Sequence, residues 1–66
     1  MKVGDMVKWI GDGGRSSILT RINRGINPGD VGIVLEILEA SHLPVEIYVM
    51  IKEHFEYFQV GEVEKL

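Results

Sequence analysis

The stretch at residues 28–38 constrains the fold most, because a turn leads there directly into a run of branched apolar residues. Pro28 fixes φ at a value that suits the second position of a turn, and Gly29 can adopt positive φ at the next position. The run from Val31 to Leu38 favours a pleated strand. Gly32 interrupts it, and a glycine inside a strand indicates a bend, a bulge or the close approach of another backbone. We therefore expect a bent central strand, as a small closed barrel requires.

The length of the chain allows one domain with little core to spare. Its 66 residues are 45% hydrophobic and rich in valine and isoleucine, which favours β structure over disorder. The chain contains no cysteine, so neither a disulfide nor a thiolate zinc site can add stability. The remaining sources of extra stability are self-association and docking on a partner.

Apolar segments separated by turn residues predict five strands in a single domain spanning residues 1–66. The expected strands lie at 3–10, 31–39, 45–52, 55–60 and 62–66. The segment at 45–52 alternates most clearly, with branched residues on the inward face: Val45, Ile47, Val49 and Ile51. The order is a strand, a long loop, three consecutive antiparallel strands, a glycine break and a short closing strand.

The connection between the first two strands is long, and two readings of it stay open. Ser16 could cap a single helical turn that Gly25 ends, with Leu19 and Ile22 on one side. Alternatively, the segment is an irregular loop that its apolar residues hold against the sheet. In both cases we expect the apolar side chains to pack and the arginines to lie outside.

The charge of the chain is unevenly distributed along the sequence. Residues 13–29 carry three arginines and no acid, giving +3, whereas the remainder carries four lysines and ten acids, giving −6. The net charge of −3 argues against a protein that coats nucleic acid by bulk electrostatics. A local phosphate-binding loop remains an alternative to a solvated loop, and its contacts would be Arg15, Arg21 and Arg24.

Two of the expected strands, at 31–39 and 45–52, carry apolar residues on both faces. The core can use only one face of a sheet, so the other face would be exposed or would meet a partner. The candidate protein-interaction residues on this outer face are Val34, Leu38, Tyr48 and Met50.

Other residue types that could carry chemistry are sparse. Trp9, Phe55, Tyr57 and Phe58 could stack on bases, but we favour core packing, since a small domain needs its aromatic residues there. Glu53-His54-x-Glu56 offers three metal ligands without a clear converging partner, so we expect a polar turn. No nucleophile and base are paired by spacing, and we expect neither an enzyme nor a metal or other cofactor.

The N-terminal residues and the apolar runs bear on location. The longest apolar run is too short to span a membrane, and no apolar region follows Lys2 as a signal peptide would require. We therefore expect a cytoplasmic protein without a membrane partner.

The order of elements resembles the Src-homology-3-like barrel. The segment Gly29-Asp30-Val31-Gly32-Ile33-Val34, together with Ile37, is similar to the Gly-x-x-Gly-x-Val signature of KOW domains, which occur in ribosomal and transcription-elongation proteins. KOW domains usually carry a basic residue before the first glycine, whereas Pro28 stands there in this chain. The opening segment Val3-Gly4-Asp5-Met6-Val7 and the closing segment Val60-Gly61-Glu62-Val63-Glu64 also resemble small proteins encoded by tailed phages. This last resemblance implies a virion component or a host protein as partner, and a location in the host cytoplasm or the virion.

Two functions follow as expectations. The first is a non-enzymatic module, such as a small phage-like accessory protein, that binds a protein partner or a second copy through its apolar outer face. The alternative is an RNA- or DNA-binding KOW-like module that uses the arginine-rich loop.

Overall fold

The protein forms one β-sheet with a short helix inserted between its first two strands. The structure is a computed structural model that describes residues 1–11 and 15–66, with the backbone alone at residues 15–17. In chain order the elements are β1 (Met6–Trp9), α1 (Arg15–Asn23), β2 (Val31–Leu38), β3 (Glu46–Ile51), β4 (His54–Gln59), the 3-10 helix η1 (Val60–Glu62) and β5 (Val63–Lys65). The expected glycine-rich tip at 12–14 lies outside the described residues.

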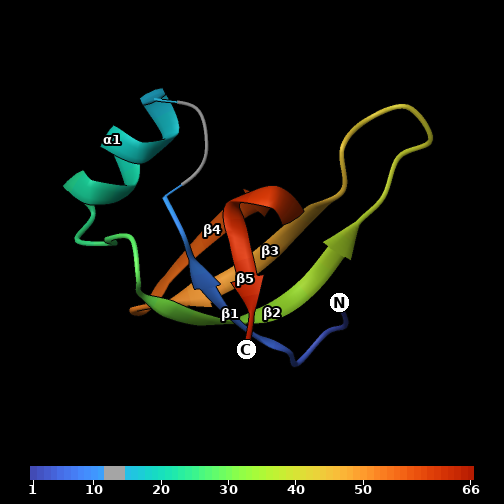
Figure 1. The fold of residues 1–66 in the computed structure, drawn as a ribbon, viewed down its shortest axis with the longest axis horizontal. Coiled ribbons are helices and arrows are strands. Elements are labelled where there is room, and N and C mark those ends of the chain that lie inside the picture. The colour runs from blue at the N-terminus through green and yellow to red at the C-terminus, as the bar shows by residue number, and fades with distance from the viewer. Residues whose placement is uncertain (12–14) are drawn as a thin grey trace.

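The five strands form a single antiparallel sheet in the order β4-β3-β2-β1-β5. The prediction of an all-β domain is confirmed. The sheet folds over on itself, so that β1 and β5 cross in front of β3 and β4 in Figure 1. Among the described residues, β4 and β5 each pair with one neighbour only, so the sheet has two edges and is not closed.

The turn before β2 has the geometry that its sequence predicts. Asp30 N donates to Asn27 O at 3.0 Å, and Gly29 between them has φ of +97°. These features, with Pro28 in the preceding position, define a type II turn. Backbone hydrogen bonds in both directions connect the turn to Trp9, so it also fixes the end of β1.

Gly32 lies where atoms of β3 leave no room for a side chain on β2. A Cβ atom at this position would lie 2.6 Å from both Met50 O and Val49 Cγ1. The expectation of a close backbone approach is therefore confirmed. The register of β2 against β3 shifts two residues further on, between Val34 and Glu36, which marks an irregularity at Leu35.

This irregularity overturns the expected position of Val34. We expected Val34 on the outer face, but its side chain is only 1% exposed and belongs to the core. Gly32 and Val34 point inward before Leu35, whereas Ile37 points inward after it. An extra residue in one strand inverts the alternation beyond it, and uniform alternation along 31–38 is therefore the wrong description of β2.

The connection between β1 and β2 forms helix α1. The sequence had left two alternatives for this segment, a single helical turn or an irregular loop. The helix lies to one side of the sheet (Figure 1) and ends in a Schellman motif, in which Gly25 N donates to Ile22 O and Ile26 N donates to Arg21 O. Gly25 ends the helix as expected, with φ of +85°. Ser16 lies within the helix rather than at its cap, because the helix begins at Arg15.

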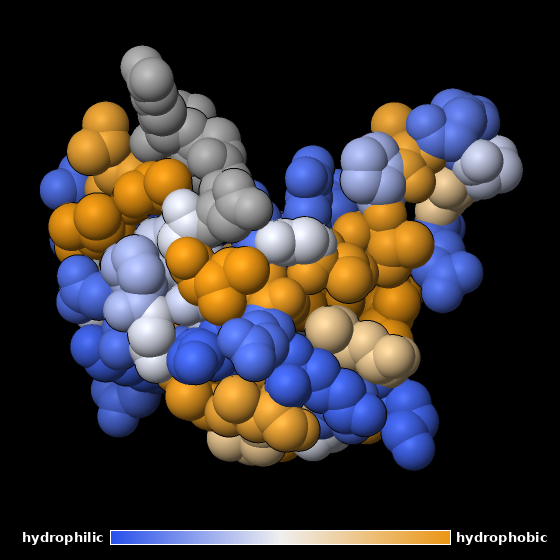
Figure 2. Space-filling model, in the orientation of Figure 1, coloured by the Kyte–Doolittle hydropathy of each residue, from blue (hydrophilic) through white to orange (hydrophobic). Residues whose placement is uncertain are grey.

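The side of α1 that faces the core also differs from expectation. Leu19 and Ile22 are exposed, and hydrophobic atoms lie at the surface over α1 in Figure 2. Ile18 packs against the core instead, and Arg21, three residues later on the same helix face, is buried. The expectation that all arginines lie outside is therefore wrong for Arg21.

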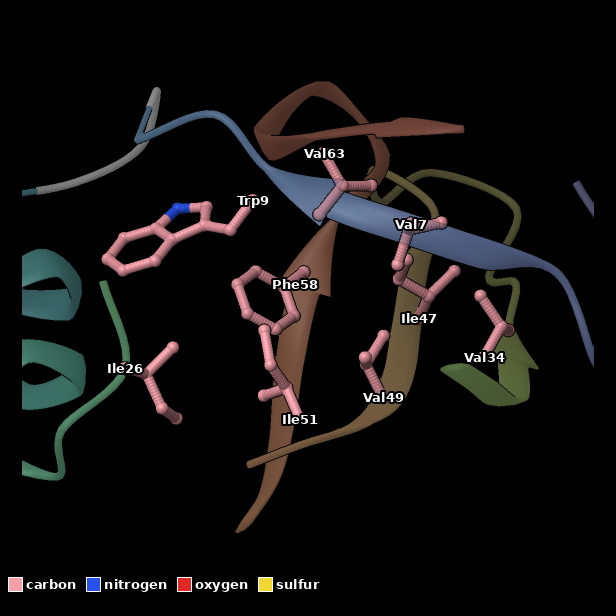
Figure 3. Close-up of a cluster of buried hydrophobic side chains, with 9 residues drawn as sticks. All are labelled: Val7, Trp9, Ile26, Val34, Ile47, Val49, Ile51, Phe58 and Val63. Atoms are coloured by element: carbon pink, nitrogen blue, oxygen red, sulfur yellow. The ribbon is translucent and has the colours of Figure 1, made fainter. Parts of the chain in front are cut away.

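The core lies between the two folded halves of the sheet. Figure 3 shows side chains from all five strands and from the segment after α1 pointing toward one another. Its buried members are Val7, Trp9, Ile26, Val34, Ile47, Val49, Ile51, Phe58 and Val63. Three of the four residues expected inward on β3 are confirmed, whereas Val45 precedes the strand and is exposed.

The first and last strands are shorter than expected. β1 begins at Met6 because the preceding residues turn: Asp5 N donates to Lys2 O, and Gly4 has φ of +92°. The chain between β4 and β5 forms η1, so the last strand begins at Val63. Both corrections concern segments where backbone turns compete with strand pairing.

Candidate functional site

Four large side chains gather on the outer surface of the β3-β4 hairpin, and we call them the aromatic face: Tyr48, Met50, Phe55 and Tyr57. Tyr48 pairs with Tyr57 and Met50 pairs with Phe55 in the antiparallel register, so all four point to the same side. The ring of Tyr48 lies 4.7 Å from that of Tyr57 and 5.8 Å from that of Phe55, between centroids. The rings therefore form one continuous surface.

The aromatic face is exposed, although it is apolar. Phe55 and Tyr57 are each 53% exposed and Met50 is 42% exposed, while Tyr48 is partly covered by its two ring neighbours. Leu38 lies beyond them on the same side of the sheet, opposite Glu46, and is also exposed. A group of exposed rings of this kind on a small domain is typical of an interaction surface.

The sequence identified part of this surface. Tyr48, Met50 and Leu38 lie on the outer side as predicted, and Val34 does not. Phe55 and Tyr57 were assigned to the core, but only the other two aromatic residues of that group, Trp9 and Phe58, are buried. Strict alternation in 54–59 would have separated Phe58 from Phe55 and Tyr57, since positions 55 and 57 share a face that 58 does not.

Arg21 occupies a buried site at the edge of the sheet. Its side chain is 6% exposed and lies 3.0 Å from the carboxylate of Glu62, which is equally enclosed. Arg21 Nη2 also donates to Tyr57 O at 2.6 Å, and Gln59 N donates to Glu62 Oε2 at 3.3 Å. Both backbone groups belong to β4, an edge strand, so the ion pair satisfies groups that a further strand would otherwise pair.

Aromatic rings complete the surroundings of Arg21. Its guanidinium carbon lies 4.0 Å from the centroid of Phe58 and 5.2 Å from that of Trp9, which is cation–π geometry. Arg21 Nη1 and Trp9 Nε1 make no hydrogen bond within the described part of the chain. Arg21 therefore connects α1, η1 and β4 through the core, which is a structural role.

The other two arginines of the candidate phosphate site differ from Arg21. Arg24 donates to Glu56 at 2.6 Å and is about half exposed, so it is accessible but already paired with a carboxylate. The side chain of Arg15 lies outside the described residues. The structure thus leaves Arg24 as the one described arginine of the three that a phosphate group could reach.

The β3-β4 turn consists of Lys52 and Glu53, which both have positive φ, at 50° and 66°. Two such residues between Ile51 and His54 form a type I′ turn, which favours asparagine and glycine. Lys52 Nζ lies 3.0 Å from Asp30 Oδ2 and 3.2 Å from Gly25 O. Two hydrogen bonds hold the pKa of the Asp30 carboxyl below its usual 3.8. The bond from Asn27 N has the larger effect, and the bond from Lys52 has the smaller one.

The three potential metal ligands after β3 do not converge. Glu53 lies in the turn, and Glu56 pairs with Arg24. Within residues 1–11 and 15–66, no three histidine or acidic side chains are arranged to hold a metal ion.

In the part of the chain that the structure describes, no helix is long and apolar enough to cross a membrane. Comparisons with protein-family models, with curated proteins and with solved structures found no match to this chain.

Proposed function

We propose that this chain is a non-enzymatic protein-binding module whose contact surface is the aromatic face. The observation that carries the proposal is the exposure of Phe55 and Tyr57 on either side of the half-buried ring of Tyr48, with exposed Met50 beside them. Aromatic and methionine side chains are enriched at protein interfaces, and tyrosine buries a large area at a small cost in conformational entropy.

The scaffold that we propose is a Src-homology-3-like barrel. Its support is the pairing of β2, β3 and β4 as consecutive antiparallel neighbours, with β1 between β2 and β5. The 3-10 helix η1 carries the chain from one edge strand to the other. A role as a phage accessory or virion-associated protein remains a prediction from the resemblance of its Val-Gly-Asp and Val-Gly-Glu segments.

The charges around the candidate sites favour a protein partner over a nucleic acid. Arg21 is enclosed and Arg24 is paired, so neither arginine whose side chain the structure describes in this segment is a free cation. Between Val31 and Ile51 the chain contains no lysine or arginine at all. A nucleic acid stacked on the aromatic face would gain no phosphate contact from β2 or β3.

Site-specific photo-crosslinking tests the proposal. A photoreactive phenylalanine analogue at position 57 should crosslink to a defined partner polypeptide or to a second copy of the chain. The same analogue at Leu19, which is exposed on α1 and is not part of the aromatic face, serves as the matched control. The purified partner should then bind the wild-type protein and bind the Tyr57→Lys/Met50→Lys variant at least about tenfold more weakly. Equal crosslinking from positions 57 and 19, or equal binding by the variant, would contradict the proposal.

A further inference from the structure

The described acidic residues divide into two groups by their ion pairs. Five carboxylates are paired with a lysine or an arginine: Asp5, Asp30, Glu56, Glu62 and Glu64. Four others in the described ranges make no ion pair: Glu36, Glu39, Glu46 and Glu53. All four fall within residues 36–53, so the uncompensated negative charge is concentrated on one part of the molecule.

Three of these unpaired carboxylates border the aromatic face. Glu36 lies directly opposite Tyr48 across the β2-β3 ladder, which places both side chains on one side of the sheet. Glu46 precedes Tyr48 by two residues on the same strand and therefore shares its face. Glu53 is part of the exposed turn that joins Met50 and Phe55. The rings are thus bordered by acids on the β2 side and at both ends of the hairpin.

Among the side chains that the structure describes, no lysine or arginine forms an ion pair with these acids. Lys52 is the nearest basic residue in the sequence, and it is directed to Asp30 and Gly25. In the described ranges, the other paired cations lie in β1, in α1, directly after α1 and in β5: Lys8, Arg21, Arg24 and Lys65. A partner that covers the rings must therefore supply the positive charge.

We infer that the partner bound by the aromatic face is a cationic polypeptide segment, a conclusion that rests on the function proposed above. Arginine or lysine side chains of such a segment would stack on the exposed rings of Phe55 and Tyr57. Their charged ends would pair with Glu36, Glu46 and Glu53, and arginine can pair with a carboxylate through two parallel hydrogen bonds. One kind of side chain thus satisfies both the rings and the carboxylates.

Partners of other chemistry fit this surface less well. A neutral apolar segment would bury Glu36 and Glu46 without a counter-charge, and an unpaired buried charge is costly. A polyanion would meet the acids directly and be repelled. A second copy would bring the same acids to the interface if its own aromatic face took part, since an isologous contact uses the same surface twice.

Fluorescence anisotropy with labelled peptides tests the inference. The probes are three peptides of equal length in which alanine alternates with arginine, with glutamine or with glutamate. The arginine peptide should bind the wild-type protein, more weakly as the ionic strength rises, and the other two should not bind. If the arginine peptide binds no better than the glutamine peptide, the inference is wrong.

Two sets of variants locate the binding site of the arginine peptide. Glu36→Gln/Glu46→Gln should weaken binding by about tenfold, and Phe55→Ala/Tyr57→Ala by about fivefold or more. Glu64→Gln is the control, because it removes an exposed carboxylate from β5 and should change the affinity by less than about twofold. Equal losses from Glu64→Gln and from Glu36→Gln/Glu46→Gln would show attraction by net charge alone and would overturn the inference.

The outcome also separates this inference from the proposed function. If the arginine peptide does not bind while the crosslinked partner still depends on Tyr57 and Met50, the aromatic face is a protein-binding surface and the inference about charge is wrong. If neither binds, both the inference and the proposed function are wrong.

Discussion

Arg21 Nη2 lies 3.0 Å from Glu62 Oε2, and both side chains are more than nine-tenths buried. The pair joins α1 to η1 and is hydrogen-bonded to β4 through Tyr57 O and Gln59 N. The charged pair therefore satisfies backbone groups of the edge strand β4 that no neighbouring strand pairs. Removing either Arg21 or Glu62 would leave the other charge buried and unpaired.

We expect Arg21→Ala to lower the free energy of unfolding by about 3 kcal/mol or more, because Glu62 would remain buried without a counter-charge. Arg24→Ala is the matched control, and it should cost less than about 1 kcal/mol, since the Arg24–Glu56 pair is partly exposed. Urea unfolding followed by tryptophan fluorescence measures both. If Arg21→Ala is unfolded without urea, Arg21→Met/Glu62→Gln should recover a folded protein. Equal unfolding midpoints for the two single variants would contradict the structural role of Arg21.

Gly32→Ala should destabilise the sheet by about 1–3 kcal/mol, because its Cβ would overlap Met50 O and Val49 Cγ1. Gly61→Ala provides the control, since a Cβ there meets no atom within 4 Å. That change should be neutral or stabilising by about 0.4–1 kcal/mol through the unfolded chain. Thermal unfolding of the two variants compares them directly. A Gly32→Ala protein as stable as the wild type would mean that β3 does not approach β2 so closely.

The sequence predicts those parts of the fold in which neighbouring residues alone determine the backbone conformation or the side of the sheet on which a side chain lies. Pro28 and Gly29 form the expected turn, which is of type II, and the alternation in 46–51 places Ile47 and Val49 inward. Neither feature needs information from distant residues. The same applies to Tyr48 and Met50, which lie outward because their neighbours lie inward.

Tertiary contacts decide the features that the sequence did not predict. Nothing in the composition of β2 reveals that Leu35 interrupts its alternation, so Val34 was placed on the wrong face. The burial of Arg21 depends on Glu62, more than forty positions later in the chain, and on the rings beside it. Helical spacing from Ile18 gives a hint, because Arg21 lies on the same helix face, but spacing alone does not identify the ion pair.

Glu53→Gly should stabilise the protein by about 0.5–1 kcal/mol. Glu53 has φ of 66°, and a left-handed conformation costs a residue with a side chain roughly 1–2 kcal/mol, part of which the entropy of glycine offsets. Glu64→Gly in β5 is the control and should destabilise, because the backbone there is an ordinary strand. Urea midpoints decide between these outcomes, and a loss of stability at both sites would contradict the type I′ turn.

The stability of the protein should fall in acid as Asp30 is protonated. Asn27 N and then Lys52 hold the pKa of Asp30 below 3.8, so its contribution is present above the unfolded-state pKa. That contribution is lost as the pH falls through the lower, folded-state pKa. Asp30→Asn should therefore reduce the dependence of stability on pH in this range, although Asp5, whose pKa is also lowered, keeps part of it.

An NMR titration of the Asp30 carboxyl group should give a midpoint below 3.8, and Lys52→Ala should raise that midpoint. Lys65→Ala is a suitable control, because Lys65 contacts Asp5 rather than Asp30. A midpoint for Asp30 at or above its usual value would exclude the hydrogen bonds from Asn27 and Lys52.

Single-stranded RNA should bind the protein weakly even at low ionic strength. The net charge is −3, Arg21 is enclosed by Glu62, and Arg24 already pairs with Glu56. Anisotropy of a labelled homopolymeric RNA measures this, with Arg24→Ala as the variant, because Arg24 can be changed without disturbing the buried pair. We expect no difference between Arg24→Ala and the wild type. Binding that falls with rising salt and is weakened by Arg24→Ala would favour the RNA-binding alternative and count against the aromatic face as the principal contact surface.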